Sequence, residues 1–240
     1  MLQKIYDSLL TLAYPQVCHN CQESVEASHD GIACRKCWES SRIFSGNETL
    51  CAKCAAFLQE KPSNFQALCH QCDEHFYDAA RAVGLYEKAL AASVLNLKRE
   101  PFVCPNLKNL FIAAFEKSSF QDSTVIIPVP LSKRRFLERG FNQAEVLAGI
   151  LSKRFQLKVD GQSLARKVHT PLHRAAMDRR ARELTVENAF EVTRPNLVKG
   201  ERILLVDDVF TSGATTSYCA KALKKNGADK VYVLTIARVF

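Results

Sequence analysis

The stretch Ile203-Leu204-Leu205-Val206-Asp207-Asp208-Val209-Phe210-Thr211-Ser212-Gly213-Ala214-Thr215-Thr216 places an apolar run, two carboxylates and a small-residue turn in direct succession. A short, continuous apolar run is typical of a strand that is covered on both faces in an α/β sheet. Such sheets bind ligands at the carboxyl ends of their strands. We therefore expect a strand over 203–206 in an α/β domain, with Asp207 and Asp208 at its carboxyl end, where their carboxylates can accept hydrogen bonds from vicinal hydroxyls.

The turn that follows the acidic pair has the composition of a phosphate site. Gly213 permits backbone conformations that are closed to other residues, and a helix is expected over 216–226, ending at Gly227. Free N–H groups at a helix start bind phosphate, assisted by the helix dipole. The residues expected to contact the phosphate are Thr211, Ser212, Gly213, Ala214 and Thr215. The alternative is a strand that ends in Asp-Asp before an N-capped helix without binding anything.

The segment 203–216 resembles the phosphoribosyl pyrophosphate (PRPP) loop of the type I phosphoribosyltransferases. This resemblance implies that the acidic pair holds the ribose 2′- and 3′-hydroxyls and that the turn holds the 5′-phosphate. It also implies a parallel-sheet fold of that class. No G-x-x-x-x-G-K-[ST] string occurs in the chain, which excludes a P-loop.

Eight of the ten cysteines form four C-x-x-C pairs in the first third of the chain. This spacing allows two thiolates to meet one metal ion and predicts two successive structural Cys₄ zinc ribbons. Sequential pairing is the default, and a cross-braced arrangement stays open. Disulfides are the alternative, and the absence of a secretory signal near Met1 counts against them. The expected ligands are Cys18, Cys21, Cys34, Cys37, Cys51, Cys54, Cys69 and Cys72.

The length of 240 residues suits a chain of two parts. We expect an N-terminal helix and double zinc ribbon over residues 1–76 and an α/β domain over residues 77–240. Within the second part, a strand and then a helix are expected over 79–98, a helix over 106–117, a strand over 124–129 and a helix that runs through about Phe155. No apolar run approaches the ~20 residues needed to cross a bilayer, so we expect a soluble, cytoplasmic protein without membrane insertion.

The order of a double zinc ribbon, PVPLS (128–132) with a downstream RGFNQ (139–143), and LLVDDVFTSGATT (204–216) is similar to the ComF family of competence-associated phosphoribosyltransferase-like proteins. The resemblance implies a pyrophosphate-side loop over 128–132 and a mobile hood loop over 166–190. It implies PRPP, or a related phosphorylated sugar, as the ligand, with Mg²⁺ as the metal and other DNA-uptake proteins as partners. The residues expected on the pyrophosphate side are Pro130, Leu131, Ser132, Lys133 and Arg135.

Two classes of function are therefore expected. The first is an enzyme that transfers phosphoribose to an unidentified nitrogen acceptor, with Asp207 and Asp208 at its centre. The second is a factor that handles single-stranded DNA or acts as a regulator, with a pocket that senses PRPP without turnover. The net charge of +8 fits either class. One basic stretch suits either a nucleic-acid backbone or a phosphate-bearing ligand, and its residues are Arg166, Lys167, Arg174, Arg179, Arg180 and Arg182.

Overall fold

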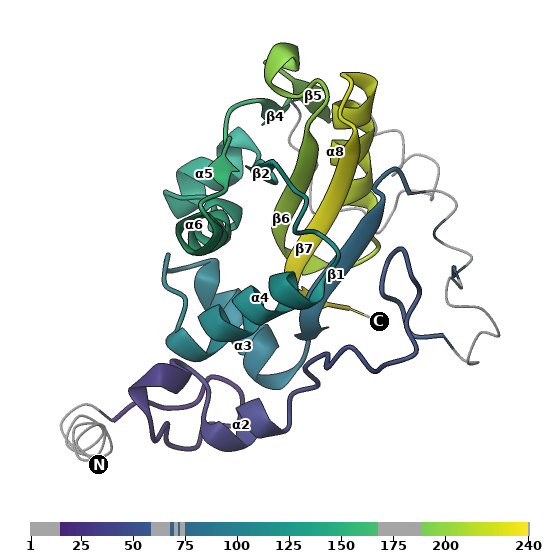
Figure 1. Cartoon of the computed structure of the whole chain (residues 1–240). Coiled ribbons are helices and arrows are strands. Elements are labelled where there is room, and N and C mark those ends of the chain that lie inside the picture. Colours follow the sequence, from purple (N-terminus) through teal and green to yellow (C-terminus); the bar gives the residue numbers. More distant parts are fainter. Residues whose placement is uncertain (1–14, 59–67, 70–71, 73–74, 168–188, 240) are drawn as a thin grey trace, which may run out of the picture.

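The computed structural model describes residues 15–58, 68–69, 72, 75–167 and 189–239 (Figure 1). At its centre is a five-stranded sheet in which every described pairing is parallel. This arrangement confirms the expected α/β fold with a parallel sheet. In spatial order, the strands are β1 (Ala79–Leu85), β7 (Lys230–Arg238), β6 (Arg202–Phe210), β2 (Val125–Pro128) and β3 (Lys158–Val159).

Helices cover both faces of the sheet. Successive side chains of β6 point to opposite faces, and both faces are apolar and packed against helices. Leu204 and Val206 lie in the core shared with α3 (Lys88–Leu97), α4 (Pro105–Lys117) and α6 (Gln143–Phe155). Ile203 and Leu205 point the other way, into the core shared with α8 (Ala214–Lys225). Burial on both faces explains why this strand is a continuous apolar run.

Several expected elements are confirmed within a few residues. The strand and helix expected over 79–98 are β1 and α3, and the helix expected over 106–117 is α4. Before α6, the structure has a separate short helix, α5 (Lys133–Arg139), because Gly140 adopts φ 78° and ends it. Asn142 then starts α6 by accepting a hydrogen bond from the Ala144 amide at 3.0 Å.

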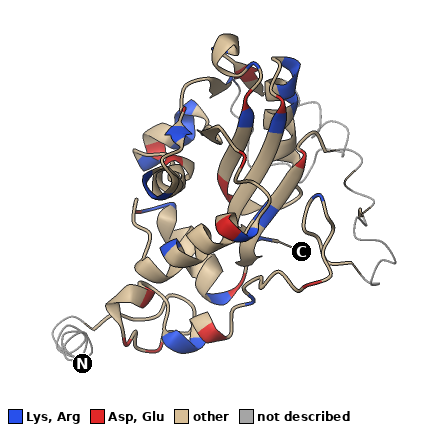
Figure 2. Cartoon of the chain, in the orientation of Figure 1, with Lys and Arg blue, Asp and Glu red and all other residues tan. Residues whose placement is uncertain are grey.

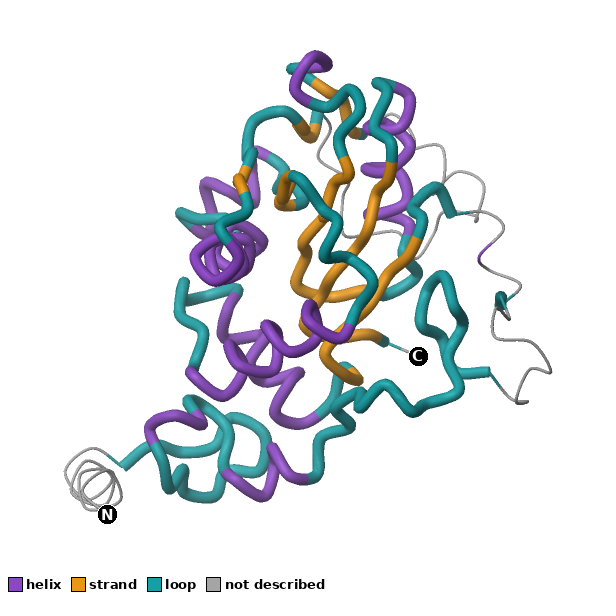
Figure 3. Tube along the Cα trace, in the orientation of Figure 1, coloured by secondary structure: helices purple, strands orange, loops and turns teal. Residues whose placement is uncertain are grey.

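The Cys-rich segment has little regular structure, and loops dominate it in Figure 3. Its described part contains one 3₁₀ turn, η1 (Ser28–Asp30), and one short helix, α2 (Arg35–Glu39). The remaining elements lie near the top of Figure 1: a hairpin of β4 (Leu164–Arg166) with β5 (Phe190–Val192), and the 3₁₀ turn η3 (Pro195–Leu197). Among the described helices, none has both the length and the apolar composition of a membrane span.

Candidate functional site

The acidic pair lies inside β6 rather than after it, which corrects the expected end of the strand at Val206. β6 continues to Phe210 because β7 runs alongside it as far as the pair Phe210–Arg238. On the other side, β2 ends earlier, with Pro128 opposite Val206. Among the described residues, the part of β6 that contains the two acids therefore has no strand partner on the β2 side. It lies at the carboxyl end of the sheet, which is where α/β folds bind ligands.

Asp208 is held by two residues from other elements. Its side chain is only 9% exposed, and its Oδ2 lies 3.5 Å from Lys98 Nζ and 3.3 Å from Gln143 Nε2. Gln143 is itself buried, and its Oε1 has no hydrogen-bond partner in the part of the chain that the structure describes. Neither Lys98 nor Gln143 was among the residues expected at the site. The RGFNQ motif was a signal for Gln143, whereas nothing in the local sequence points to Lys98.

Asp207 is partly exposed, but protein surrounds its carboxylate closely. This burial, together with the neighbouring charge of Asp208, raises the pKa of Asp207 well above the ordinary carboxyl value. The amide of Asp208 donates to Asp207 Oδ1 at 2.8 Å, which opposes the rise. Burial and the neighbouring charge both disfavour the ionised form of Asp207. A bound cation or a hydroxyl donor would therefore stabilise its carboxylate.

Asp207→Asn is expected to stabilise the ligand-free protein near neutral pH. Because the pKa is raised in the folded state, protonated Asp207 contributes stability below the ordinary carboxyl pKa of about 3.9, and this contribution is lost as the pH rises through the raised pKa. The asparagine side chain cannot ionise, so the variant does not lose free energy of unfolding as the pH rises. At pH 8 its melting temperature should exceed that of wild type by roughly 2–4 °C, which corresponds to about 1 kcal/mol in the free energy of unfolding, and at pH 4 the difference should be smaller. Calorimetric scans of both proteins across this range check the prediction, and an equal difference at both pH values would contradict it.

The turn after β6 has the form expected of an anion site. Gly213 adopts φ 75° and caps α8, which begins at Ala214, two residues earlier than expected. Within the described part of the chain, no protein group accepts a hydrogen bond from the amides of 211–213, 215 or 216. The Ala214 amide has only a long contact of 3.4 Å to Ser212 Oγ. The helix start therefore presents free donors beside the acidic pair.

The expected pyrophosphate-side residues lie between β2 and α5. Ser132 is buried and caps α5 by accepting a 3.4 Å hydrogen bond from the Arg135 amide. Pro130, Leu131 and Arg135 are partly exposed, and Lys133 is exposed. Asn142 connects α6 to this segment, because its Nδ2 donates a hydrogen bond to the Val129 carbonyl at 3.1 Å. The same RGFNQ motif thus contacts both this loop and Asp208.

The described ends of the expected hood loop lie next to each other. β4 and β5 pair antiparallel, and the Lys167 amide donates to the Ala189 carbonyl at 2.8 Å. Arg166 lies over the Phe190 ring at 5.3 Å, and Lys167 Nζ is 2.5 Å from Glu191. These two basic side chains are therefore engaged locally. The other basic residues proposed for this loop, Arg174, Arg179, Arg180 and Arg182, lie outside the described residues.

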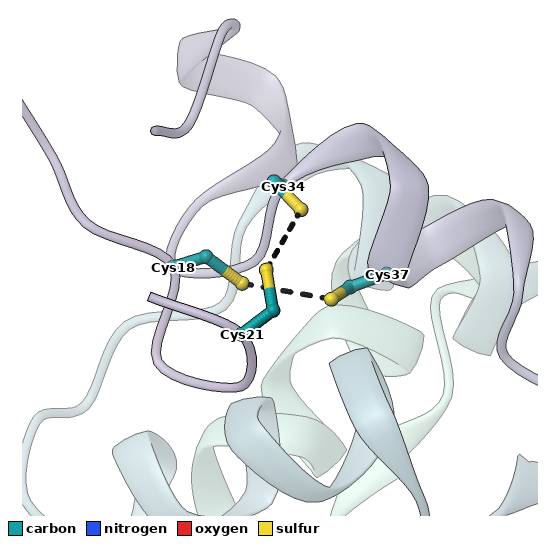
Figure 4. Close-up of side chains that lie close together, drawn as sticks. All are labelled: Cys18, Cys21, Cys34 and Cys37. Carbon is teal, nitrogen blue, oxygen red and sulfur yellow. Dashed lines mark hydrogen bonds between the residues drawn. The ribbon is translucent and has the colours of Figure 1, made fainter. Parts of the chain in front are cut away.

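The eight paired cysteines form two separate Cys₄ clusters, which settles the open question of pairing in favour of the sequential arrangement. In the first cluster, the Sγ atoms of Cys18 and Cys37 are 3.7 Å apart and those of Cys21 and Cys34 are 3.5 Å apart (Figure 4). The second cluster is formed by Cys51, Cys54, Cys69 and Cys72, with the Cys51 and Cys72 sulfurs 3.4 Å apart.

These clusters fit structural Zn²⁺. A tetrahedral site with Zn–S bonds of ~2.3 Å requires sulfurs about 3.8 Å apart, close to the observed separations. Burial opposes ionisation of Cys18, but the N–H groups of Cys21 and Cys34 outweigh it and lower the pKa of Cys18 to about 6. Four thiolates close the coordination shell, so such a site supports folding rather than catalysis.

The purified protein is expected to contain two zinc ions per chain. Cys37→Ser and Cys72→Ser should each reduce this to one, because each removes a ligand from a different cluster. Chelation should unfold the Cys-rich segment before the sheet domain, since small ribbons depend on their metal for folding. Elemental analysis and limited proteolysis after chelation measure both effects. Protein free of metal with oxidised cysteines would contradict the assignment.

Comparison with known families gives two matches along the chain. The model described as "Double zinc ribbon domain" matches residues 9–76, and the model described as "Phosphoribosyl transferase domain" matches residues 115–239. The chain is 30% identical to "DNA utilization protein YhgH" of Escherichia coli K12 over 236 residues, covering 95% of this chain and 99% of that protein. It is 26% identical to "Competence protein ComFC" of Bacillus subtilis, covering 84% and 89% of the two chains, and 28% identical to "Competence protein F" of Haemophilus influenzae, covering 92% and 96%.

Among solved structures, glutamine PRPP amidotransferase from B. subtilis matches with 17% identity and a TM-score of 0.37. The match covers 74% of this chain but only a third of the length of that enzyme. With the motifs, the sheet, the two clusters and the sequence relatives taken together, the chain belongs to the ComF family, in which a double zinc ribbon is joined to a phosphoribosyltransferase domain.

Proposed function

We propose that the domain binds PRPP, or a closely related phosphorylated ribose, together with Mg²⁺. The observation that supports this most strongly is the junction of β6 and α8. There, two carboxylates at an unpaired strand edge lead directly into a turn whose amides have no protein acceptor among the described residues. Carboxylates suit the ribose hydroxyls, and free amides suit the 5′-phosphate.

The residues around the acidic pair would orient it for this ligand. Lys98 and Gln143 contact one oxygen of Asp208, which leaves the pair asymmetric in charge and position. A hard oxygen donor set of carboxylates and ligand phosphates fits Mg²⁺. When bound, the metal would supply charge neutralisation for the pyrophosphate group. Lys133 and Arg135 lie on the segment that would face the same group.

If turnover occurs, the bond from the ribose C1 to the pyrophosphate oxygen breaks and a bond from C1 to a nitrogen nucleophile forms. Pyrophosphate leaves with the bonding electrons, and the nucleophile loses a proton to the departing pyrophosphate or to solvent water. The chain's contribution is to hold ribose and phosphate in place and to balance the growing charge of the leaving group. A sensor would use the same site without the second substrate.

Isothermal calorimetry with PRPP, in the presence of Mg²⁺ and then in buffer prepared without Mg²⁺ or any chelator, tests the proposal. Binding is expected only with Mg²⁺. Pyrophosphate release on addition of candidate nitrogen nucleophiles then separates an enzyme from a sensor. Absence of PRPP binding under both conditions would overturn the proposal.

A second candidate function, contact with single-stranded DNA in a DNA-utilisation role, is supported by α5. None of its residues is buried, and Phe136 and Leu137 are 47% and 74% exposed. Four of the seven residues of α5 are basic, namely Lys133, Arg134, Arg135 and Arg139, and Figure 2 colours them blue along the ribbon. An exposed aromatic ring among cations is a platform on which a base can stack. The names of the bacterial relatives refer to DNA utilisation and competence, which agrees with this role.

Phe136→Ala is expected to weaken binding to a single-stranded oligonucleotide by about 1–3 kcal/mol, because one stacked base is lost. Its salt dependence should match that of wild type, since no charge changes. Lys133→Gln should instead lower the slope of log K against log salt by roughly 0.7. Fluorescence anisotropy measures both, with Phe102→Ala as the control, since Phe102 is also exposed but lies between α3 and α4. Equal losses for Phe136→Ala and Phe102→Ala would contradict a specific role for α5.

A further inference from the structure

We infer that the second zinc ribbon is coupled to the phosphate turn, and that Arg238 and Phe210 are the positioning residues that transmit this coupling. The turn is the segment 211–216, and its role as a phosphate site rests on the proposed function. The coupling itself rests on contacts between the described residues. It predicts that loss of metal from the second ribbon disturbs the start of α8, whereas loss from the first does not.

Arg238 connects the end of β7 to the second cysteine cluster. This residue is 5% exposed, and its guanidinium donates to the Cys54 carbonyl through Nη1 and lies 3.7 Å from Cys54 Sγ through Nη2. A buried cation beside a metal-binding thiolate stabilises the negative charge of the sulfur. Arg238 is therefore placed to strengthen the second metal site.

The same guanidinium lies over the ring of Phe210, with its carbon 4.6 Å from the ring centroid. Phe210 is the residue immediately before the turn, and it is 3% exposed. Its ring packs so closely against Gly213 that a Cβ at that position would come within 2.5 Å of the ring. The backbone carbonyl of Phe210 also accepts from the Val239 amide at 2.9 Å. The shape of the turn is therefore set by the position of this ring.

The segment that follows Cys72 also contacts Phe210 and the start of α8. Tyr77, which is 1% exposed, meets the Phe210 ring edge to face at 5.9 Å. The Phe76 amide donates to Ser217 Oγ at 3.1 Å, in the first turn of α8. Phe210 and the start of α8 are thus packed against groups that the second zinc site holds in place.

The first ribbon contacts a different part of the sheet domain and serves as an internal control. Asn106 of α4 donates to Asp30 at 3.1 Å, and Gly31 packs against Cys104. Within the described residues, no hydrogen bond, ion pair or ring contact joins residues 15–41 to the segment 207–217. Loss of metal from this ribbon has no direct route to the turn.

Thermodynamic linkage makes the coupling reciprocal. A variant that frees Phe210 should lower the zinc affinity of the second ribbon, and a ligand that fixes the turn should raise it. We expect these changes in affinity to appear as faster and slower zinc release. The release from the first ribbon should not respond in either case. Zinc release is followed with a colorimetric chelator, which resolves the two sites by comparison with Cys37→Ser and Cys72→Ser.

The test uses the full chain and two readouts that do not need PRPP. The first readout is hydrogen-exchange mass spectrometry. Cys72→Ser should increase the exchange rate at least about tenfold for the amides that begin α8, where the Ser217 amide donates to the Gly213 carbonyl at 2.8 Å. Cys37→Ser should leave this segment unchanged, and exchange in α6 should stay at the wild-type rate in both variants. Arg238→Met should accelerate release of one zinc ion about tenfold and leave the other unchanged, with partial recovery in Arg238→Lys.

Equal exchange at the start of α8 in wild type and Cys72→Ser would overturn the coupling. If Cys72→Ser does not fold, Arg238→Met decides, and wild-type release rates for both zinc ions in that variant would overturn it equally. A failure of PRPP to bind would refute the proposed function instead, because exchange and zinc release are measured without it. With binding established, protection of both zinc ions to the same extent by PRPP would also contradict a link confined to the second ribbon.

Discussion

Asp208→Asn is expected to weaken Mg²⁺-dependent PRPP binding about a hundredfold while leaving the fold intact. Hydrogen bonds to a charged group contribute about 1.5–3 kcal/mol each, and 1.4 kcal/mol corresponds to a factor of ten in affinity. Asn preserves the shape of the side chain between Lys98 and Gln143 but removes the charge that ribose hydroxyls and a cation would meet. Calorimetry with PRPP measures the loss.

Asp229→Asn is the matched control for this effect. Asp229 is an exposed acid between α8 and β7, away from the strand edge that carries the pair, so its substitution changes the net charge by the same amount. We expect wild-type affinity for this variant. Equal PRPP affinities for Asp208→Asn and wild type would show that the acidic pair does not bind PRPP.

Gly213→Ala is expected to weaken PRPP binding by at least about tenfold and to destabilise the protein by about 1–3 kcal/mol. The backbone at Gly213 has φ 75°, which is strained for a residue with a Cβ, and the added carbon would meet the Phe210 ring at 2.5 Å. Relief of this contact requires Phe210 or the turn to move, and either shift displaces the free amides. Calorimetry and denaturant unfolding measure the two losses.

Gly149→Ala provides the comparison for Gly213→Ala. Gly149 lies inside α6 with nothing within 4 Å of an added Cβ, so the same substitution should stabilise the helix by up to about 1 kcal/mol and leave PRPP binding unchanged. A wild-type affinity in Gly213→Ala would show that the turn does not need its observed conformation.

Much of the fold could be predicted because local signals and tertiary packing agree. The apolar run 203–206 is a strand because both faces of it are buried, and the break at Gly227 comes just after α8 ends at Lys225. The cysteine spacing predicted two metal clusters, but their pairing stayed open, since only the folded chain brings Cys18 to Cys37 and Cys51 to Cys72.

The parts that could not be predicted depend on neighbours distant in sequence. β6 extends through Asp207 and Asp208 because β7 continues beside it, and no property of the acidic residues reveals this. Lys98 reaches Asp208 from the end of α3, more than a hundred residues earlier in the chain. The contact of Arg238 with Cys54 is similarly invisible in the sequence, since it depends on where the ribbon packs.

A crystal structure of the protein with PRPP and Mg²⁺ tests the central claim most directly. We predict that oxygens of the 5′-phosphate lie roughly 3 Å from backbone amides within 211–216, and that the ribose hydroxyls face Asp207 and Asp208. PRPP bound elsewhere on the chain, or a saturating concentration that leaves this turn and the acidic pair without ligand, would contradict the account.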